Sequence, residues 1–420
     1  MSQPTRILLA LILGLALGIA GAHFGWEGAV AYAAPVGGMW LDSLRMTIVP
    51  LVVALLVTGI GRTADSARGG GLALRAVILF VAMLWLVTAI AAVLVPGLLT
   101  LWPMPADAAA ALRGAVAHGA APVGADAVKA AAAAPPIADF LKSIIPTNPI
   151  AAAAQDAMLP LIFFTTLFAV AVTRLEAPAR ERITGLFGAI EGAMLVMVGW
   201  VLLLAPIGVG ALAFVTGINA GTAAIGALVH YILIVSCAGL AAWALAYPMA
   251  VFGGKVKLMD FVRAVVPAQA VALSTQSSLA SLPAMLKACE RLGVPIDTAG
   301  VPLPIAVAIF RVTSPAMNLA VAIYVAHWFG VPLTLGALLA GAVVAAITTV
   351  GSISLPGQVS FLTAITPIAA AMGVPIEPLA LLVAVEMLPD LVRTVGNVTM
   401  DVAATVTVAR HSREAEEEGG

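Results

Sequence analysis

The sequence has little charge. Asp, Glu, Lys and Arg together make up only 10% of its 420 residues, whereas hydrophobic residues reach 62%. The mean hydropathy is +1.10. Because charged residues make up about a quarter of an average soluble domain, this composition excludes an ordinary soluble protein. It indicates a chain embedded in a lipid bilayer.

A basic excess is also missing, and cysteine is scarce. The chain has 20 Lys and Arg residues against 21 Asp and Glu residues, which leaves no strongly positive surface for nucleic acid. Its two cysteines are too few for a disulfide framework, and Cys237 lies within an apolar run. We therefore exclude nucleic acid as a partner, and we expect neither redox chemistry nor an organic cofactor.

Signature motifs of membrane enzymes and ATP-driven pumps are missing as well. The sequence contains no H-E-x-x-H zinc motif and no G-x-x-x-x-G-K-[ST] phosphate-binding loop. Only His230 and His327 fall within apolar runs, and neither has a serine at a recognisable catalytic spacing. An intramembrane hydrolase and an ATP-driven pump are therefore disfavoured.

Long apolar runs are what the sequence has in abundance. A helix must be about 30 Å long to cross the hydrocarbon core of a bilayer. Runs of sufficient length occur after residue 300 and at residues 7–23, 46–61, 74–100, 151–173, 185–216 and 222–252. They predict eight or more crossings. No convincing cleavage site follows the first run, so we interpret it as a transmembrane helix and not as a signal peptide.

Positive charge is unevenly divided between the predicted loops. Fourteen of the twenty Lys and Arg residues fall on one predicted side and four on the other. By the positive-inside rule, the loaded side is cytoplasmic and holds both termini. The Ala-rich residues 105–144 then form an extracellular loop. The expected location is the cell (inner) membrane, with several crossings.

A stripe of polar residues runs along the last apolar segment. Its members are 4, 3, 4 and 4 residues apart, a spacing that keeps them on one helical face: Glu386, Asp390, Arg393, Asn397 and Asp401. A buried structural ion network is one interpretation. Charged groups within a bilayer are costly and commonly functional, and five polar groups need a wet cavity or a ligand. We therefore favour a functional site.

Two other segments have the pattern of interrupted hairpins. The first covers residues 261–292, with S-T-Q-S-S-L-A-S-L-P at its centre, and the second covers residues 331–371, with G-S-I-S-L-P-G-Q. Such segments in corresponding positions of two halves predict an inverted repeat with a binding site at the membrane midplane. Two kinked helices that pack through small residues are the alternative.

These features resemble the dicarboxylate/amino acid:cation symporter family, which has the glutamate-transporter fold. The most specific match is D-L-V-R-T-V-G-N-V-T-M-D at residues 390–401, which is similar to the signature of the family's last helix. Further similar segments are L-R-M-T-I-V-P-L-V at residues 44–52, I-P-T-N-P at 145–149, L-P-L-I-F-F at 159–164 and A-P-I-G-V at 205–209. The resemblance covers nearly the whole chain.

The resemblance implies an all-α membrane protein with eight transmembrane helices, two re-entrant helical hairpins and inverted repeats. In such an elevator-type homotrimer, a mobile transport domain slides against a fixed scaffold. The implied parts are scaffold helices 1–2 in residues 1–72, transport-domain helix 3 in 73–104, the extracellular loop in 105–144, scaffold helices 4–5 in 145–220, the remaining transport domain in 221–410 and a cytoplasmic tail in 411–420.

The resemblance also implies a binding site for a small anionic solute. By position, Asp390 would hold a substrate amino group, Arg393 an anionic side chain and Asn397 the main carboxylate, while Asp401 would hold a coupling cation. Arginine suits a carboxylate because its planar fork donates two charge-assisted hydrogen bonds. The other implied substrate residues are Ser277, Ser278, Ser314, Ser354, Pro356, Gly357 and Thr394.

The seventh span departs from the family pattern. It reads F-R-V-T-S at residues 310–314, where family members have N-M-D-G-T and bind sodium through the Asn and Asp. The aligned oxygen ligands of the third span are replaced by Phe80, Met83 and Leu84. The loss of an Asp and the gain of Arg311 shift the local charge by +2, as two sodium ions would. We hypothesise that Arg311 is a built-in cation; alternatively, it only ties this span to the last one.

A transporter without exchangeable sodium sites must couple to protons, to a remaining cation site or to a counter-substrate. Glu386 and Asp401 are the expected proton carriers, Arg311 and Asn397 complete the coupling group, and Asp401 is the ligand of any residual sodium site. The sequence therefore predicts a symporter for an acidic amino acid or a C4-dicarboxylate with reduced or no sodium dependence. A transport-inactive sensor or a channel on the same fold is the alternative.

Overall fold

The computed structural model describes residues 3–67, 71–104, 109, 144–155, 157–351 and 357–419. Nearly all of these residues are helical, and none of them lies in a β-strand. The predicted all-α class is confirmed. Most of the predicted loop at residues 105–144 lies outside the described residues, as does the tip of the second predicted hairpin with Ser354 and Pro356.

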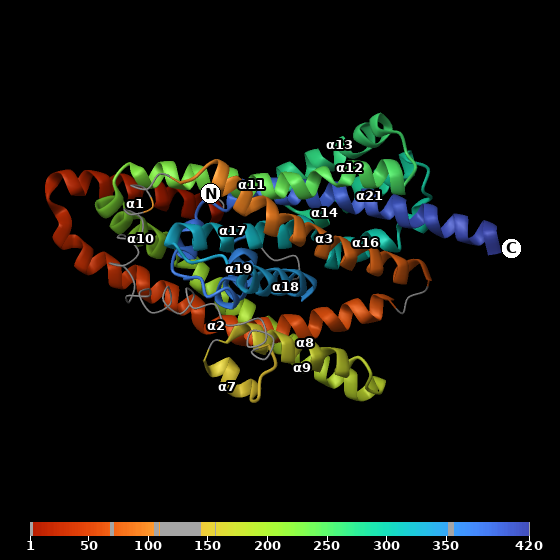
Figure 1. Cartoon of the computed structure of the whole chain (residues 1–420), viewed down its shortest axis with the longest axis horizontal. Helices are drawn as coiled ribbons and strands as arrows, with labels where there is room; N and C mark the ends of the chain where they lie inside the picture. The colour runs from red at the N-terminus through yellow and green to blue at the C-terminus, as the bar shows by residue number, and fades with distance from the viewer. Residues whose placement is uncertain are drawn as a thin grey trace.

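The N-terminal half consists mainly of long helices (Figure 1). They are α1 (Gln3–Phe24), the 3-10 turn η1 (Trp26–Ala29), α2 (Val30–Ala67), α3 (Gly71–Leu101), α7 (Pro149–Ala154), α8 (Met158–Val172), α9 (Ala177–Leu203) and α10 (Ala205–Ala220). Here α1 packs against α10, and α2 packs against both α9 and α10.

The apolar run at residues 185–216 does not form one span. It is divided between α9, which ends at Leu203, and α10, which begins at Ala205 with proline in its first turn. Proline has no amide hydrogen for an interior helical bond and is well suited to the first turn of a new helix. Our prediction of a continuous run was wrong here, because hydropathy does not register this break.

The C-terminal half contains shorter, more interrupted helices. They are α11 (Ala223–Ala244), α12 (Ala246–Pro248), the π-helical turn η2 (Met249–Gly253), α13 (Leu258–Thr275), α14 (Ser278–Arg291), α15 (Ile296–Ala299), α16 (Pro302–Ile309), α17 (Thr313–Phe329), α18 (Leu335–Gly351), α19 (Gly357–Ala371), α20 (Leu379–Leu382) and α21 (Met387–Gly419). Each predicted interrupted segment forms two helices that pack together, α13 with α14 and α18 with α19.

Helix α17 forms the centre of this half. Every residue from 313 to 326 is buried, so this part of the helix has no face toward solvent or lipid. It packs against α3, α11, α18, α19 and α21, and Figure 1 shows it in the middle of the molecule. Polar groups on α17 therefore have to find partners within the protein.

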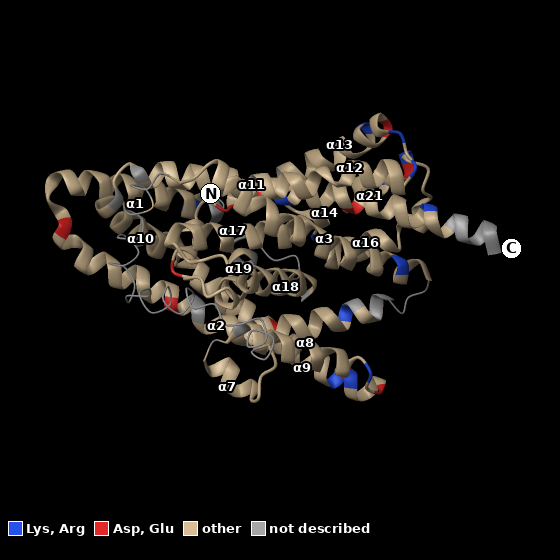
Figure 2. Cartoon of the chain, in the orientation of Figure 1, with Lys and Arg blue, Asp and Glu red and all other residues tan. Residues whose placement is uncertain are grey.

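The helices suit a bilayer in length and composition. Within the described residues, six helical stretches are long and apolar enough to cross a membrane. Large apolar side chains such as Leu13, Val93 and Trp200 are exposed, as expected for surfaces that face lipid. Figure 2 shows Lys and Arg gathered toward one end of the molecule, around the beginnings of α3, α9 and α13.

Candidate functional site

The site begins at an interruption between α16 and α17. Helix α16 ends at Ile309, and Phe310 leaves the helical conformation with φ −105° and ψ 80°. The Phe310 ring is fully buried and stacks on Phe80 of α3, with the ring centroids 4.4 Å apart. The two aromatic residues that replace oxygen ligands in our sequence comparison therefore lie against each other.

Asn397 of α21 caps the start of α17. Its Oδ1 atom accepts hydrogen bonds from the Thr313 amide at 3.0 Å and from the Thr313 hydroxyl at 2.8 Å. The same hydroxyl also lies 3.0 Å from the backbone oxygen of Arg393. Because the first amides of a helix have no partner within it, Asn397 satisfies one of them and ties the interruption to α21.

Gly396 allows this close approach. A Cβ atom at its position would lie 2.5 Å from Thr313 Cγ2 and 3.1 Å from the Cβ of Trp243 in α11. Both distances are shorter than ordinary carbon contacts. Three helices thus meet at a position that has no room for a side chain.

Arg393 lies at the centre of a buried polar cluster. Its Nη2 atom is 2.6 Å from Glu386 Oε1, its Nε atom is 3.2 Å from Asp390 Oδ1, and its Nη1 atom donates to Asn318 Oδ1 at 2.8 Å. The Arg393 and Glu386 side chains are only 4% and 1% exposed. Three residues of the predicted stripe are therefore brought together around one guanidinium.

Asn318 is a member of this cluster that the sequence analysis missed. It comes from α17 and not from the last helix, so the spacing of the stripe gave no sign of it. Two signals were present: a polar residue in an apolar run, and a position four residues after Ser314, which shares its helical face.

Asp401 and Arg311 form the second charged part of the site. Asp401 is buried, and neither of its carboxyl oxygens accepts a hydrogen bond from a described residue. Arg311, half-buried at the interruption, interacts electrostatically with both Asp401 and Asp390. With Arg393 and Glu386, the group contains two guanidinium groups and three carboxylates. Fully ionised, it has one net negative charge.

Two further predicted residues lie on the elements that carry this cluster. The Thr394 hydroxyl donates to the Asp390 backbone oxygen at 2.9 Å, a bond within α21 that leaves its lone pairs for another donor. The Ser314 hydroxyl is buried in the first turn of α17 and has no hydrogen-bond partner among the described residues. It is therefore a polar group available to a ligand.

The first hairpin turns at Gln276, which has the left-handed conformation with φ 51° and ψ 34°. Ser277 caps α14 by accepting a hydrogen bond from the Ala280 amide at 3.2 Å, and Ser278 is the first residue of that helix. The hairpin is tied to α21 further back, where Gln269 donates to Thr399 at 2.9 Å. A substrate contact of Ser277 or Ser278 remains a prediction, as does one of Gly357, the first residue of α19.

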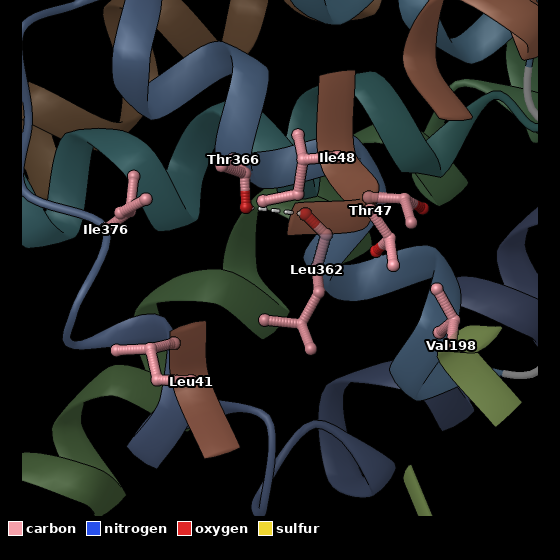
Figure 3. Close-up of a pocket in the computed structure, with 8 residues that line it drawn as sticks. Leu41, Thr47, Ile48, Val198, Leu362, Thr366 and Ile376 are labelled. Carbon is pink, nitrogen blue, oxygen red and sulfur yellow. Dashed lines mark hydrogen bonds between the residues drawn. The ribbon is translucent and has the colours of Figure 1, made fainter. Parts of the chain in front are cut away.

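A pocket lies between α2, α9 and α19 (Figure 3). The dashed line in the figure marks the bond from the Thr366 hydroxyl to the Leu362 oxygen, 2.7 Å within α19. The lining of the pocket contains no charged residue and consists of Leu41, Thr47, Ile48, Val198, Leu362, Thr363, Thr366 and Ile376.

The arrangement is that of a membrane transporter: apolar helices of bilayer length surround interrupted helices that hold a guanidinium and several carboxylates in the interior. Comparison with known proteins makes this specific. The chain belongs to the sodium:dicarboxylate symporter family, whose profile matches residues 4–411. Family membership confirms the resemblance seen in the sequence and the prediction of a transport protein and not an enzyme.

Individual relatives cover almost the whole chain. The chain is 27% identical to the proton/glutamate-aspartate symporter of Escherichia coli (strain K12), over 97% of this chain and 92% of the relative. It is 25% identical to the proton/sodium-glutamate symport protein of Bacillus subtilis (strain 168), with the same coverage. It is 27% identical to C4-dicarboxylate transport protein 1 of Pseudomonas paraeruginosa (strain DSM 24068 / PA7), over 96% of this chain and 88% of the relative.

Proposed function

We propose that this protein is a secondary active symporter that moves an acidic amino acid or a C4-dicarboxylate across the cell inner membrane. The observation that carries the proposal is the buried guanidinium of Arg393, with carboxyl oxygens of Glu386 and Asp390 at 2.6 and 3.2 Å. A site that already holds two carboxylates has the chemistry to hold those of a substrate. The names of the relatives, which cover both substrate classes, support this.

In this proposal, Arg393 binds one substrate carboxylate and the Asn397 amide group binds the other. The hydroxyls of Ser314 and Thr394 and the hairpin residues Ser277 and Ser278 complete the site, together with Ser354, Pro356 and Gly357 of the second hairpin. Asp390 binds the amino group when the substrate has one. Because Asp390 interacts with both Arg393 and Arg311, a dicarboxylate without an amino group fits the site equally well.

We propose an elevator mechanism, in which residues 73–104 and 221–410 move against a scaffold of residues 1–72 and 145–220. Support comes from packing, since α17 contacts α3, α11 and α21, whereas α1 and α2 pack with α10 and α9. The lining of the pocket between α2, α9 and α19 contains no charged residue, so sliding there would break no ion pair within that lining. The fold is then eight spans with two re-entrant hairpins, assembled as a homotrimer with cytoplasmic termini.

We further propose that transport has reduced or no sodium dependence. Phe80 and Phe310 stack in the interior and offer no oxygen ligands, and the charge of Arg311 balances Asp401. A fixed guanidinium there competes with an exchangeable cation through charge repulsion. Protons or a counter-substrate would then drive uptake, unless Asp401 retains a residual sodium site.

Uptake into proteoliposomes tests these proposals directly. Radiolabelled aspartate, glutamate and succinate would be supplied with an inward sodium gradient, an inward proton gradient, or unlabelled solute inside. We expect uptake of at least one acid that follows the proton gradient or exchange and ignores sodium. Strong stimulation by sodium alone would refute the sodium-independent mechanism but leave the symporter proposal intact. Binding without uptake under all three conditions would favour the sensor alternative.

A further inference from the structure

The interaction of Glu386 with Arg393 suggests how a proton is coupled to the substrate, on the basis of the proposed function. Glu386 lies immediately before α21, and its Oε1 atom makes the shortest of the three Arg393 contacts described above, at 2.6 Å. Its other oxygen, Oε2, is buried and accepts no hydrogen bond from a described residue. One carboxyl oxygen thus pairs with the guanidinium, while the other has no hydrogen-bond donor among the described residues.

We propose that Glu386 is an internal competitor of the substrate: its ionised carboxylate holds Arg393, and a proton taken up by Glu386 frees the guanidinium for a carboxylate of the substrate. Arg393 already donates toward Glu386, Asp390 and Asn318. A planar fork serves a carboxylate best through two parallel hydrogen bonds. The substrate must therefore displace a present partner.

Charge decides which partner is displaced. Asn318 is neutral, and Asp390 meets Arg393 through the longer contact of 3.2 Å while also interacting with Arg311. Within the described residues, Arg393 is the cation paired with Glu386, and the other titratable groups that interact with Glu386 electrostatically are Asp390 on α21 and Tyr231 on α11. Adding a substrate carboxylate would set three carboxylates around one guanidinium. Protonation neutralises Glu386, the carboxylate with fewer cationic partners than Asp390, and so removes its repulsion of the substrate carboxylate.

The step balances without any further reactant. A proton from water bonds to a carboxyl oxygen of Glu386, the ion pair with Arg393 becomes a hydrogen bond between neutral and charged groups, and Arg393 Nη2 turns to the substrate carboxylate. One proton enters the site with each substrate and leaves after the substrate is released. The structure thereby assigns proton symport to one named side chain.

Substrate binding as a function of pH tests this assignment. Binding of aspartate, glutamate and succinate to the full-length protein would be measured by calorimetry from mildly acidic to mildly alkaline pH. For wild type, the uptake of one proton predicts that affinity falls about tenfold for each unit of rising pH wherever Glu386 is ionised before binding. Glu386→Gln cannot ionise, so its affinity should change less than about twofold over the same range.

Glu191→Gln is a matched control. Glu191 is also a buried glutamate, but it lies in α9 and accepts a hydrogen bond from Thr58 at 2.6 Å. Its variant should keep the pH dependence of wild type. Proton uptake during binding, measured in weakly buffered solution, should be near one per substrate for wild type and Glu191→Gln and near zero for Glu386→Gln.

Other outcomes separate this inference from the proposed function. If Glu386→Gln binds substrate and keeps the tenfold slope, another group carries the proton and the inference fails, while the symporter proposal stands. If folded Glu386→Gln and Glu386→Asp both bind weakly at every pH, with the slope unchanged, Glu386 only positions Arg393 and the inference fails. If wild type neither binds nor transports any of the three acids, the proposed function fails and takes the inference with it.

Discussion

Two helix pairs in this protein are held together in opposite ways. Between α1 and α10 the backbones nearly touch: a Cβ atom at Gly18 would lie 2.2 Å from the Phe214 oxygen, and one at Gly217 would lie 2.5 Å from the Leu15 oxygen. Between α17 and α21 the contact is made by hydrogen bonds, such as those from Thr313 to Asn397. Closely packed backbones such as those of α1 and α10 fit together in one arrangement, whereas the polar groups between α17 and α21 can exchange hydrogen-bond partners.

This difference predicts a structural role for the α1–α10 pair and a role in transport for the α17–α21 pair. Association through small residues depends on van der Waals contact over a complementary surface and loses it all when the helices separate. Polar groups in a low dielectric bind strongly but can accept a ligand's carboxylate in place of a protein carboxylate. We therefore expect substitutions in the first pair to change stability, and substitutions in the second pair to change transport.

The largest effect is expected from Arg393→Lys. Lysine presents a single compact charge and cannot contact Glu386, Asp390 and Asn318 at once as the guanidinium does. Losing two charge-assisted hydrogen bonds to a substrate, about 1.5–3 kcal/mol each, predicts that uptake falls at least about 100-fold. Uptake of radiolabelled acid, normalised to reconstituted protein, measures this.

Arg62→Lys is the control for that change. Arg62 belongs to α2, its side chain is 47% exposed, and it reaches Glu191 at 3.5 Å. Uptake by Arg62→Lys should stay close to wild type. If Arg393→Lys did too, Arg393 would not be the carboxylate-binding group.

A smaller effect with a distinct ion dependence is expected from Arg311→Met. Removing the guanidinium leaves buried Asp401 without its charge partner, so we expect uptake in the absence of sodium to fall about tenfold or more. Added sodium should restore part of it, because a free cation can then approach Asp401. Uptake measured with and without sodium decides the point; a loss that sodium leaves unchanged would make Arg311 a structural tie.

Gly18→Ala and Gly396→Ala make the same substitution in the α1–α10 pair and in the α17–α21 pair. Each new Cβ atom would meet another atom at 2.5 Å or less, so both variants should lose about 1–3 kcal/mol of stability. Only Gly396→Ala should also slow uptake per folded molecule, because it separates Thr313 from Asn397. Gly199→Ala, with nothing within 4 Å of its Cβ position, should be neutral or slightly stabilising. Thermal unfolding in detergent and normalised uptake give both readouts.

The smallest effect is expected from Thr58→Val in α2. Thr58 donates to Glu191 at 2.6 Å, and loss of this bond should lower stability by about 0.5–1.5 kcal/mol, since Arg62 lies near the same carboxylate. Uptake per folded molecule should match wild type, because this pair joins α2 to α9 and takes no part in the α17–α21 contact. A change in transport rate without a change in melting temperature would contradict the division between the two regions.

Much of the site followed from spacing along the chain. The intervals of three and four residues from Asp390 to Asp401 place these polar residues on one side of α21, because helical periodicity is local. Glu386 lies before Met387, the first residue of that helix, so the prediction of one continuous helical stripe was wrong for Glu386. The resemblance to a transporter family also rested on this segment. What spacing could not supply is the pairing: that Glu386 makes the closest contact with Arg393 depends on the backbone path before α21.

Contacts between distant segments were harder to foresee. Asn318 and Thr313 joined the site through α17, and neither was among the predicted residues, since their importance lies in partners about eighty positions away. The division of residues 185–216 into α9 and α10 was missed for a related reason. Hydropathy averages over a window and is blind to a change of direction between two apolar helices.

The sequence by itself determined that this is a helical membrane protein with a polar stripe on its last helix, because composition and periodicity act within a few turns of chain. It also contained the substitutions at Phe310 and Arg311. Only the tertiary structure decided that Phe310 stacks on Phe80, that Asn397 caps α17 and that Arg393 is shared by Glu386, Asp390 and Asn318. Those contacts depend on how helices far apart in the chain pack, and no local rule specifies that packing.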